Sequence, residues 1–228
     1  MAVDIETVGQ DWDGLAPRVQ EYLVETQRGD AEAETAKERL GLHAATGRVV
    51  AIGLWDLGAA RGRVLVEGDA PDWAPFGAAG DAQIFRAGEA AMLREFWNVL
   101  ALESPLVVTF HGRGFDAPYL MLRSAILGVP PSRNLMGPRY QLSNHCDLYD
   151  VLTFWSASRM RGTLEFWACQ FGLPSPKDGM RGSDVAAMYR ERRLDEIARY
   201  CLDDARATAG LFERLRPTIA LLDSGTAL

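Results

Sequence analysis

The chain has 228 residues, 48% of them apolar, which is enough for one well-buried domain or two small ones and excludes a peptide, a disordered tail or a fibre. Its net charge of −7 and pI near 5.1 argue against a protein that coats nucleic acid or anionic lipid through overall positive charge. The three scattered cysteines fit neither a disulfide framework nor a structural zinc site, so we expect a cytoplasmic protein. The apolar runs are too short to cross a membrane, and we expect no membrane partner.

The charge is distributed unevenly along the chain. Residues 1–45 hold ten acidic and four basic residues, whereas residues 113–181 hold eight basic and five acidic ones. The pattern predicts a modest basic face on an acidic protein. Any phosphate partner would have to bind locally at such a face.

The N-terminal part of the chain is patterned for strands. Residues 2–6 predict a strand, and residues 48–56 and 63–66 predict a hairpin that extends it into an antiparallel meander. Residues 11–45 predict an acidic, partly helical excursion. Residues 69–82 are rich in proline and glycine and predict a loop.

The rest of the chain is mainly helical in pattern. A helix at 89–102, a buried strand at 106–110, a helix at 117–127 and a long surface loop at 128–145 are expected, and the strand, helix, strand order implies a parallel crossover. Further helices are expected at 148–158, 163–171, 184–190 and 194–215, with a loose tail at 217–228. No linker divides the chain, so residues 1–228 are expected to form a single domain. The predicted fold class is α/β, with a mixed five-stranded sheet flanked by helices.

Four carboxylates and a phenol stand at positions that strands and a helix could bring together. Asp4 and Glu6 are two apart on a strand, so their side chains leave from one face. Asp116 follows a buried strand at a helix start, and Tyr200 and Asp204 share one helical face. Oxygen ligands in this number suit Mg²⁺ or Mn²⁺ rather than zinc. Two such ions about 4 Å apart assist phosphodiester hydrolysis, which is the chemistry that the pattern predicts.

Three segments together also carry a family resemblance. They are Asp4-Ile-Glu6, Phe110-His-Gly-Arg-Gly-Phe-Asp116 and Tyr200-x-x-x-Asp204. In order and spacing they resemble the three motifs of the DEDD 3'-5' exonucleases, and are most similar to the bacterial group related to the proofreading domain of family-B DNA polymerases. Arg199 stands where the histidine variant of the superfamily would have its histidine, so the chain resembles the tyrosine variant.

The resemblance implies a fold, a site and a substrate. The fold would be ribonuclease H-like, and the substrate would be the 3' end of single-stranded or frayed nucleic acid, with DNA favoured. Asp4, Glu6, Asp116 and Asp204 would bind two divalent ions. Tyr200 would orient the attacking water and the scissile phosphate.

Substrate contacts are expected near the second motif and on nearby basic residues. His111 stands where members of the group often carry asparagine, and it is a candidate substrate-binding residue together with Phe115 and Lys177. Arg133 and Arg139 could contact the nucleic-acid backbone, although solvated surface charge is the commoner state for such residues.

Two alternatives remain open from the sequence. The main one is a nucleic-acid-binding or recruitment module that has the fold but no activity, which the complete set of carboxylates argues against. The other is a dinucleotide-binding turn, because residues 112–117 match a G-x-G-x-x-A pattern. Asp116 would then place a carboxylate where a pyrophosphate should sit. The sequence leaves the choice between DNA and RNA open.

Overall fold

The computed structural model describes residues 1–26, 32–69, 71–76, 81–174 and 180–224. Its strands are β1 (Ala2–Gly9), β2 (Gly47–Asp56), β3 (Arg61–Glu67), β4 (Asp72–Phe76), β5 (Ala82–Ala87), β6 (Val107–Thr109) and β7 (His145–Asp147). Its α-helices are α1 (Pro17–Glu25), α2 (Glu32–Arg39), α3 (Glu89–Glu103), α4 (Asp116–Ile126), α5 (Leu148–Leu152), α6 (Leu164–Gln170), α7 (Val185–Arg190) and α8 (Leu194–Ser224). Short 3-10 helices are η1 (Trp12–Gly14), η2 (Leu40–Leu42) and η3 (Gly182–Asp184).

The strands form one mixed sheet in the order β4-β5-β3-β2-β1-β6-β7. The first three strands make the expected antiparallel meander, in which Asp4 pairs with Gly53. On the other side of β1, strands β6 and β7 run parallel to it and to each other. Helix α3 connects β5 to β6, and these two strands run in the same direction in the sheet, so the expected parallel crossover is confirmed. Helix α4 makes a second crossover, from β6 to β7, which was not expected.

The sheet has seven strands in the described residues, so the expected count of five is wrong. Strands β4, β5 and β7 lie outside the segments expected to form strands, and β4 lies in a segment expected to be a loop. Pro75 is compatible with β4 because this strand is at the edge of the sheet, where a missing N–H costs no ladder bond. Phe76 and Ile84 are buried, and this burial favours the paired arrangement.

The C-terminal helix is longer and the helix after β7 is shorter than expected. Helix α8 continues through Pro217 to Ser224, so the expectation of a loose tail is wrong for residues 217–224. Leu215 and Ile219 flank the proline and are both buried in the core, which offsets the lost helical hydrogen bond. Helix α5 ends at Leu152 because residues 154–156 have left-handed backbones, with φ of 47°, 52° and 75°.

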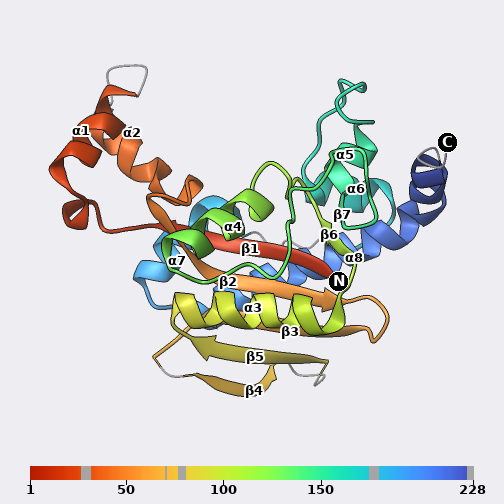
Figure 1. Ribbon diagram of the computed structural model, residues 1–228, viewed down its shortest axis with the longest axis horizontal. Coiled ribbons are helices and arrows are strands. Elements are labelled where there is room, and N and C mark those ends of the chain that lie inside the picture. Colours follow the sequence, from red (N-terminus) through yellow and green to blue (C-terminus); the bar gives the residue numbers. More distant parts are fainter. Residues whose placement is uncertain (27–31, 70, 77–80, 175–179, 225–228) are drawn as a thin grey trace.

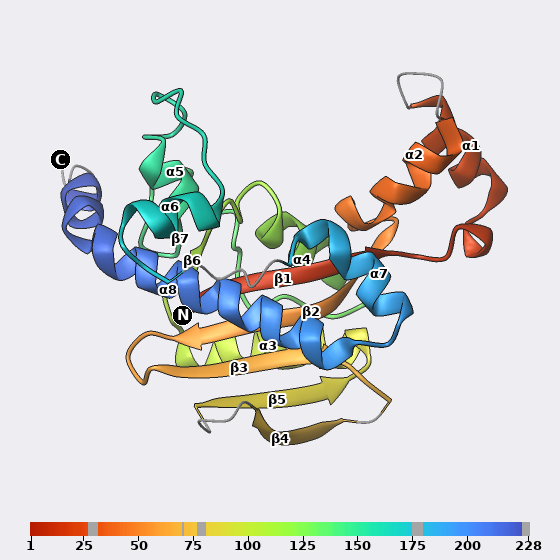
Figure 2. The same cartoon turned by 180° about the vertical axis from the view of Figure 1, so that it is seen from behind.

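Each face of the sheet packs against its own helices. Figure 1 shows α3 in front of the sheet, and Figure 2 shows α8 crossing the opposite face. Val3 and Ile5 of β1 belong to the core on the α3 and α4 side, whereas Ala2 and Val8 belong to the core under α8. Since side chains alternate along a strand, the residues between them, at 4 and 6, face α8.

The expected acidic excursion lies between β1 and β2. It contains η1, α1, α2 and η2, which extend beyond one end of the sheet in both views (Figure 1, Figure 2). The Thr7 hydroxyl ties it to β1 by donating to the Gly41 carbonyl at 2.7 Å. Within the described part of the chain, none of the helices has the length and apolar content that crossing a membrane requires.

Candidate active site

Three carboxylates from the two ends of the chain meet on the α8 face of the sheet. Asp4 and Glu6 come from β1 and Asp204 comes from α8, and one oxygen of each lies within 4.8 Å of the others. Glu6 and Asp204 are buried and Asp4 is half-buried. This separation allows one cation to contact all three carboxylates.

A glycine in β2 allows α8 to reach this face. A methyl group on Gly53, the pairing partner of Asp4, would lie 2.5 Å from the carbonyl oxygen of Cys201 and 2.8 Å from its carbonyl carbon. The Cys201 thiol also donates to the Asp4 carbonyl at 3.4 Å. The backbone of α8 therefore lies directly on the sheet at Cys201. Tyr200 and Asp204, one residue before and three residues after this contact, share one face of the helix. Sequence reasoning missed Gly53, although an isolated glycine within an apolar strand is a signal of close backbone approach.

The fourth carboxylate approaches β1 from the other layer of the fold. Asp116 is the first residue of α4, is buried, and accepts a hydrogen bond from the Ile5 backbone N–H at 3.1 Å. Ile5 lies between the two carboxylates of β1, so Asp116 borders the cluster. A carboxylate in the first turn of α4 also opposes the dinucleotide-binding alternative, because it would repel a pyrophosphate there.

Burial and neighbouring negative charges make Asp4 and Asp116 hard to ionise. The pKa of Asp4 is raised well above its usual value by burial and by the charges of Asp116, Glu6 and Asp204. Burial also raises the pKa of Asp116, to about 7, although two backbone N–H groups partly oppose the shift. A nearby positive charge would therefore favour the ionised forms of Asp4 and Asp116.

The residues present fit a divalent cation. Oxygen Oδ2 of Asp4 is buried and has no hydrogen-bond partner within the described residues, so this atom is available to coordinate a cation. The cluster offers carboxylate oxygens alone, which suit Mg²⁺ or Mn²⁺ and do not suit zinc.

Tyr200 lies beside the carboxylates in its protonated form. Only 6% of the residue is exposed. Burial raises the pKa of its phenol well above the usual value, and the charges of Asp204, Glu6 and Asp4 and a hydrogen bond to Asp204 raise it further. At neutral pH the hydroxyl is consequently a hydrogen-bond donor and not a base.

The turn between β6 and α4 is held in place by Asp147. This buried carboxylate accepts the backbone N–H groups of His111 and Arg113, each at 2.8 Å, and that of Tyr149 at 2.9 Å. His111 itself has a left-handed backbone, with φ of 63°, and its ring packs edge-on against Tyr149. Sequence reasoning missed Asp147, whose position at a strand-to-helix junction is typical of a helix N-cap.

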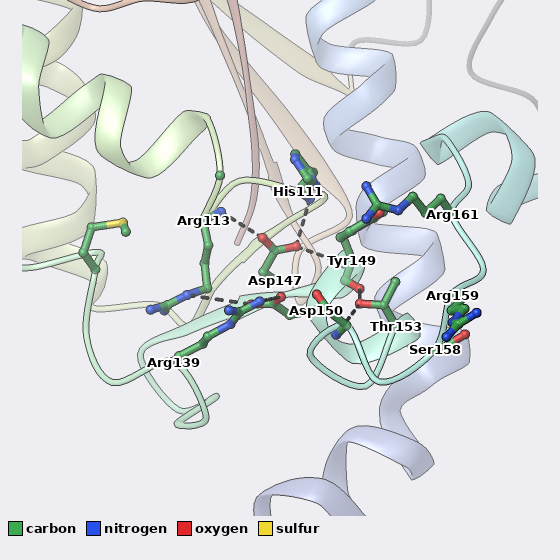
Figure 3. A pocket seen from close by; sticks show the side chains of 13 residues that line it. His111, Arg113, Arg139, Asp147, Tyr149, Asp150, Thr153, Ser158, Arg159 and Arg161 are labelled. Atoms are coloured by element: carbon green, nitrogen blue, oxygen red, sulfur yellow. Dashed lines mark hydrogen bonds and ion pairs between the residues drawn. The ribbon is translucent and has the colours of Figure 1, made fainter.

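Two cavities flank this turn, and Gly114 lines both. One, of about 690 Å³, is rich in arginine (Figure 3) and is lined by His111, Arg113, Gly114, Met136, Arg139, Asp147, Tyr149, Asp150, Thr153, Ser156, Ser158, Arg159 and Arg161. The other, of about 610 Å³, is largely apolar and lies between α4 and the acidic excursion, with Phe115, Pro118, Tyr119 and Leu122 in its wall.

The structure separates the remaining candidate residues. His111 is exposed and lines the arginine-rich cavity, whereas Phe115 is half-buried and lines the apolar one. Lys177 lies outside the described residues. Arg139 lines the arginine-rich cavity, but Arg133 donates to the Pro105 carbonyl at 2.6 Å and is not among the residues lining either cavity.

Comparison with known protein families shows that the chain is similar to proteins related to the exonuclease domain of a DNA polymerase. A family model described as "Predicted 3'-5' exonuclease related to the exonuclease domain of PolB" matches residues 79–226. This range contains Asp116, Tyr200 and Asp204, whereas Asp4 and Glu6 precede it.

Curated relatives and solved structures agree with this match. DNA polymerases of Desulfurococcus sp. (strain Tok) and Pyrococcus glycovorans are 30% identical over 150 residues and 28% identical over 152 residues, covering 59% and 60% of this chain. Each alignment covers 19% of the polymerase, so the chain spans about a fifth of these relatives. The family B DNA polymerase of the hyperthermophilic archaeon Pyrobaculum calidifontis superimposes with a TM-score of 0.61 at 23% identity, over 97% of this chain and 26% of the polymerase. The expected ribonuclease H-like α/β fold is thereby confirmed, with a different number of strands.

Proposed function

Because the chain belongs to the family of predicted 3'-5' exonucleases related to the exonuclease domain of PolB, we propose that it is a metal-dependent 3'-5' exonuclease. Its substrate would be the 3' end of single-stranded or frayed nucleic acid, with DNA favoured. The observation that carries the proposal is the cluster of Asp4, Glu6 and Asp204, whose oxygens lie within 4.8 Å of one another beside a protonated tyrosine.

The four carboxylates would hold two Mg²⁺ or Mn²⁺ ions. Asp4, Glu6 and Asp204 form the cluster, and Asp116 borders it from the start of α4. When bound, the ions stabilise the charge on the attacking and leaving oxygens of a phosphodiester. The buried setting strengthens every electrostatic interaction made there.

Tyr200 would position the reacting groups. Its hydroxyl is protonated and therefore can donate a hydrogen bond to a phosphate oxygen or hold a water molecule. Its interaction with Asp204 orients the ring next to the carboxylates. The shared helical turn fixes the distance between the two residues.

Three further residues would contact the substrate strand. Phe115 lies at the wall of the apolar cavity, directly before Asp116, and would stack against a base. His111 lines the other cavity and would donate to phosphate or sugar. Lys177 would contribute a phosphate contact from the segment between α6 and η3.

Activity on a 5'-labelled single strand with Mg²⁺ or Mn²⁺ tests the proposal. A ladder that shortens from the 3' end is expected for the native chain and for Asp195→Ala, an exposed carboxylate on the same helix. No products are expected for Asp4→Ala or Asp204→Ala. Binding of the strand by the native chain without products under either metal would refute the proposal and favour the inactive-module alternative.

Tyr200→Phe separates positioning from metal binding. Loss of one donor should reduce kcat roughly 100-fold, and Mn²⁺ affinity measured by calorimetry should stay unchanged. A large loss of Mn²⁺ affinity in this variant would contradict the role given to the hydroxyl.

A further inference from the structure

The arginine-rich cavity is distinct from the carboxylate cluster and opposite to it in charge. Four arginines line it: Arg113 from the turn before α4, Arg139 from the segment before β7, and Arg159 and Arg161 from the segment between α5 and α6. Figure 3 shows the last two beside α5, on the segment that borders the cavity.

The negative charges of the two acidic residues in the cavity are already compensated by hydrogen bonds and ion pairs within the protein. Asp147 accepts three backbone N–H groups. Asp150 pairs with Arg139 at 2.9 Å and lies 3.9 Å from the Nε of Arg113. Both acids are buried, so little negative charge remains at the cavity surface.

Arg159 and Arg161 are the arginines available to a ligand. Both are exposed, and neither forms an ion pair with any residue in the described ranges. A guanidinium group without a partner binds phosphate oxygens in a bidentate manner. Two such groups on one wall of a cavity are suited to a polyanion.

The segment that carries these arginines is held by backbone hydrogen bonds. The N–H of Trp155 donates to the Asp150 carbonyl at 2.7 Å, and that of Ser158 donates to the Thr153 carbonyl at 2.9 Å. The left-handed residues 154–156 redirect the chain along the cavity. The start of the segment is thus ordered before any ligand arrives, which reduces the entropic cost of binding.

The position of the cavity relative to the carboxylates suggests the ligand. The turn at 111–114 is one wall of the cavity, and Asp116 follows it by two residues. A strand whose terminal phosphodiester lies at the carboxylates could therefore continue past this turn into the cavity. Ser156 and Ser158 add neutral donors to the arginines there.

The geometry points to this cavity as the binding site for the phosphodiester backbone on the 5' side of the scissile bond, with Arg159 and Arg161 as the phosphate contacts. The inference rests on the proposed function, because it assumes that the 3' end lies at the carboxylates. The contacts are to phosphates alone, so binding is independent of base sequence.

Binding without cleavage is the first test. Anisotropy of a 5'-labelled ten-nucleotide strand is measured in EDTA over a range of salt concentrations. Arg159→Ala/Arg161→Ala should weaken binding on the order of tenfold to hundredfold and make the slope of log K against log salt shallower by about 1.4. Arg94→Ala/Arg214→Ala changes the same charge at exposed positions outside the cavity and should leave both quantities unchanged.

Steady-state cleavage with metal is the second test. The variant with both cavity arginines removed should show a higher KM and an unchanged kcat for the ten-nucleotide strand. A dinucleotide without a 5' phosphate has no phosphodiester on the 5' side of the scissile bond, so the variant should cleave it as the native chain does.

The outcomes separate this inference from the proposed function. An unchanged salt slope and KM in the double variant would overturn the inference, even if cleavage is normal. Arginine-dependent binding of the strand in a chain that cleaves nothing would support the cavity as a strand site and refute only the nuclease activity. Binding of thymidine 5'-monophosphate through the same arginines more tightly than the ten-nucleotide strand would assign the cavity to a free nucleotide and overturn the inference.

Discussion

The substitution Gly53→Ala tests whether the close approach of α8 to the sheet sets the geometry of the carboxylate cluster. The added methyl would lie 2.5 Å from the Cys201 carbonyl oxygen, whereas ordinary van der Waals contact begins at 3.4 Å. The obstacle is helix backbone and cannot rotate away. Helix α8 must therefore retreat by about 0.9 Å, and Asp204 must move away from Asp4 with it.

This displacement should affect turnover more strongly than folding. Misplacement of reacting groups by about 1 Å can reduce turnover roughly 100-fold. An additional methyl in a well-packed core costs about 1–3 kcal/mol of unfolding free energy. We expect a folded variant whose kcat is about 100-fold lower and whose affinity for Mn²⁺ is weaker.

Turnover on a labelled single strand and unfolding in urea measure the two effects. Gly62→Ala is the matched control, because its methyl would lie 2.9 Å from the side-chain Cδ1 of Leu202, which can rotate. This control should retain turnover within a few-fold of the native value. A kcat for Gly53→Ala within threefold of the native value, or an equal loss in both variants, would refute the reasoning.

Three further substitutions test other parts of the fold. Arg123→Met removes the partner of Glu89 from a buried ion pair with a separation of 2.7 Å, and should lower the free energy of unfolding in urea by about 3–5 kcal/mol. Arg63→Met, which breaks the more exposed ion pair with Glu103, should lower it by under about 1 kcal/mol. Equal losses in the two variants would contradict this expectation. Asp147→Ala leaves three backbone N–H groups without their acceptor and should cost about 2–5 kcal/mol in thermal unfolding, so a loss under 1 kcal/mol would count against the role described. Because the pKa of Asp116 is raised to about 7 in the folded metal-free chain, its contribution to stability is present in acid and is lost as the pH rises from about 4 to 7. In the native chain, the free energy of unfolding in urea and EDTA should therefore fall by on the order of 4 kcal/mol across this pH range, and Asp116→Asn should abolish this fall. Parallel pH profiles of the unfolding free energy for the two proteins would disprove the assignment.

The candidate ligands could be proposed from the sequence because their spacing is local. Asp4 and Glu6 are two residues apart on a strand, so their side chains lie on one face of it. Tyr200 and Asp204 are four residues apart on a helix, so they also share a face. The structure brings three of these carboxylates within one cluster. Which strand and which helix meet depends on non-local packing at Gly53. The glycine indicates that a backbone approaches closely, but no local pattern specifies which element does so.

Other parts of the fold depended on packing that the sequence pattern does not reveal. Strands β4 and β5 are short and separated from β3 by a segment rich in turn residues, so their pairing at the sheet edge had no strong local signal. The continuation of α8 past Pro217 depends on the burial of Leu215 and Ile219 against the core. The arginine-rich cavity combines residues from four separate segments, and therefore it forms only in the folded chain.

The carboxylates of the cluster come from distant parts of the sequence, so the candidate site can form only late during synthesis. Cys201 of α8 and Asp4 of β1 touch although they are 197 positions apart. Contacts this distant in sequence form late, because the long intervening loop must close first. A growing chain emerges at about 5–20 residues per second, so for many seconds β1 would be outside the ribosome without its helix. A nuclease built this way would stay inactive beside its own messenger RNA until α8 docks on the sheet.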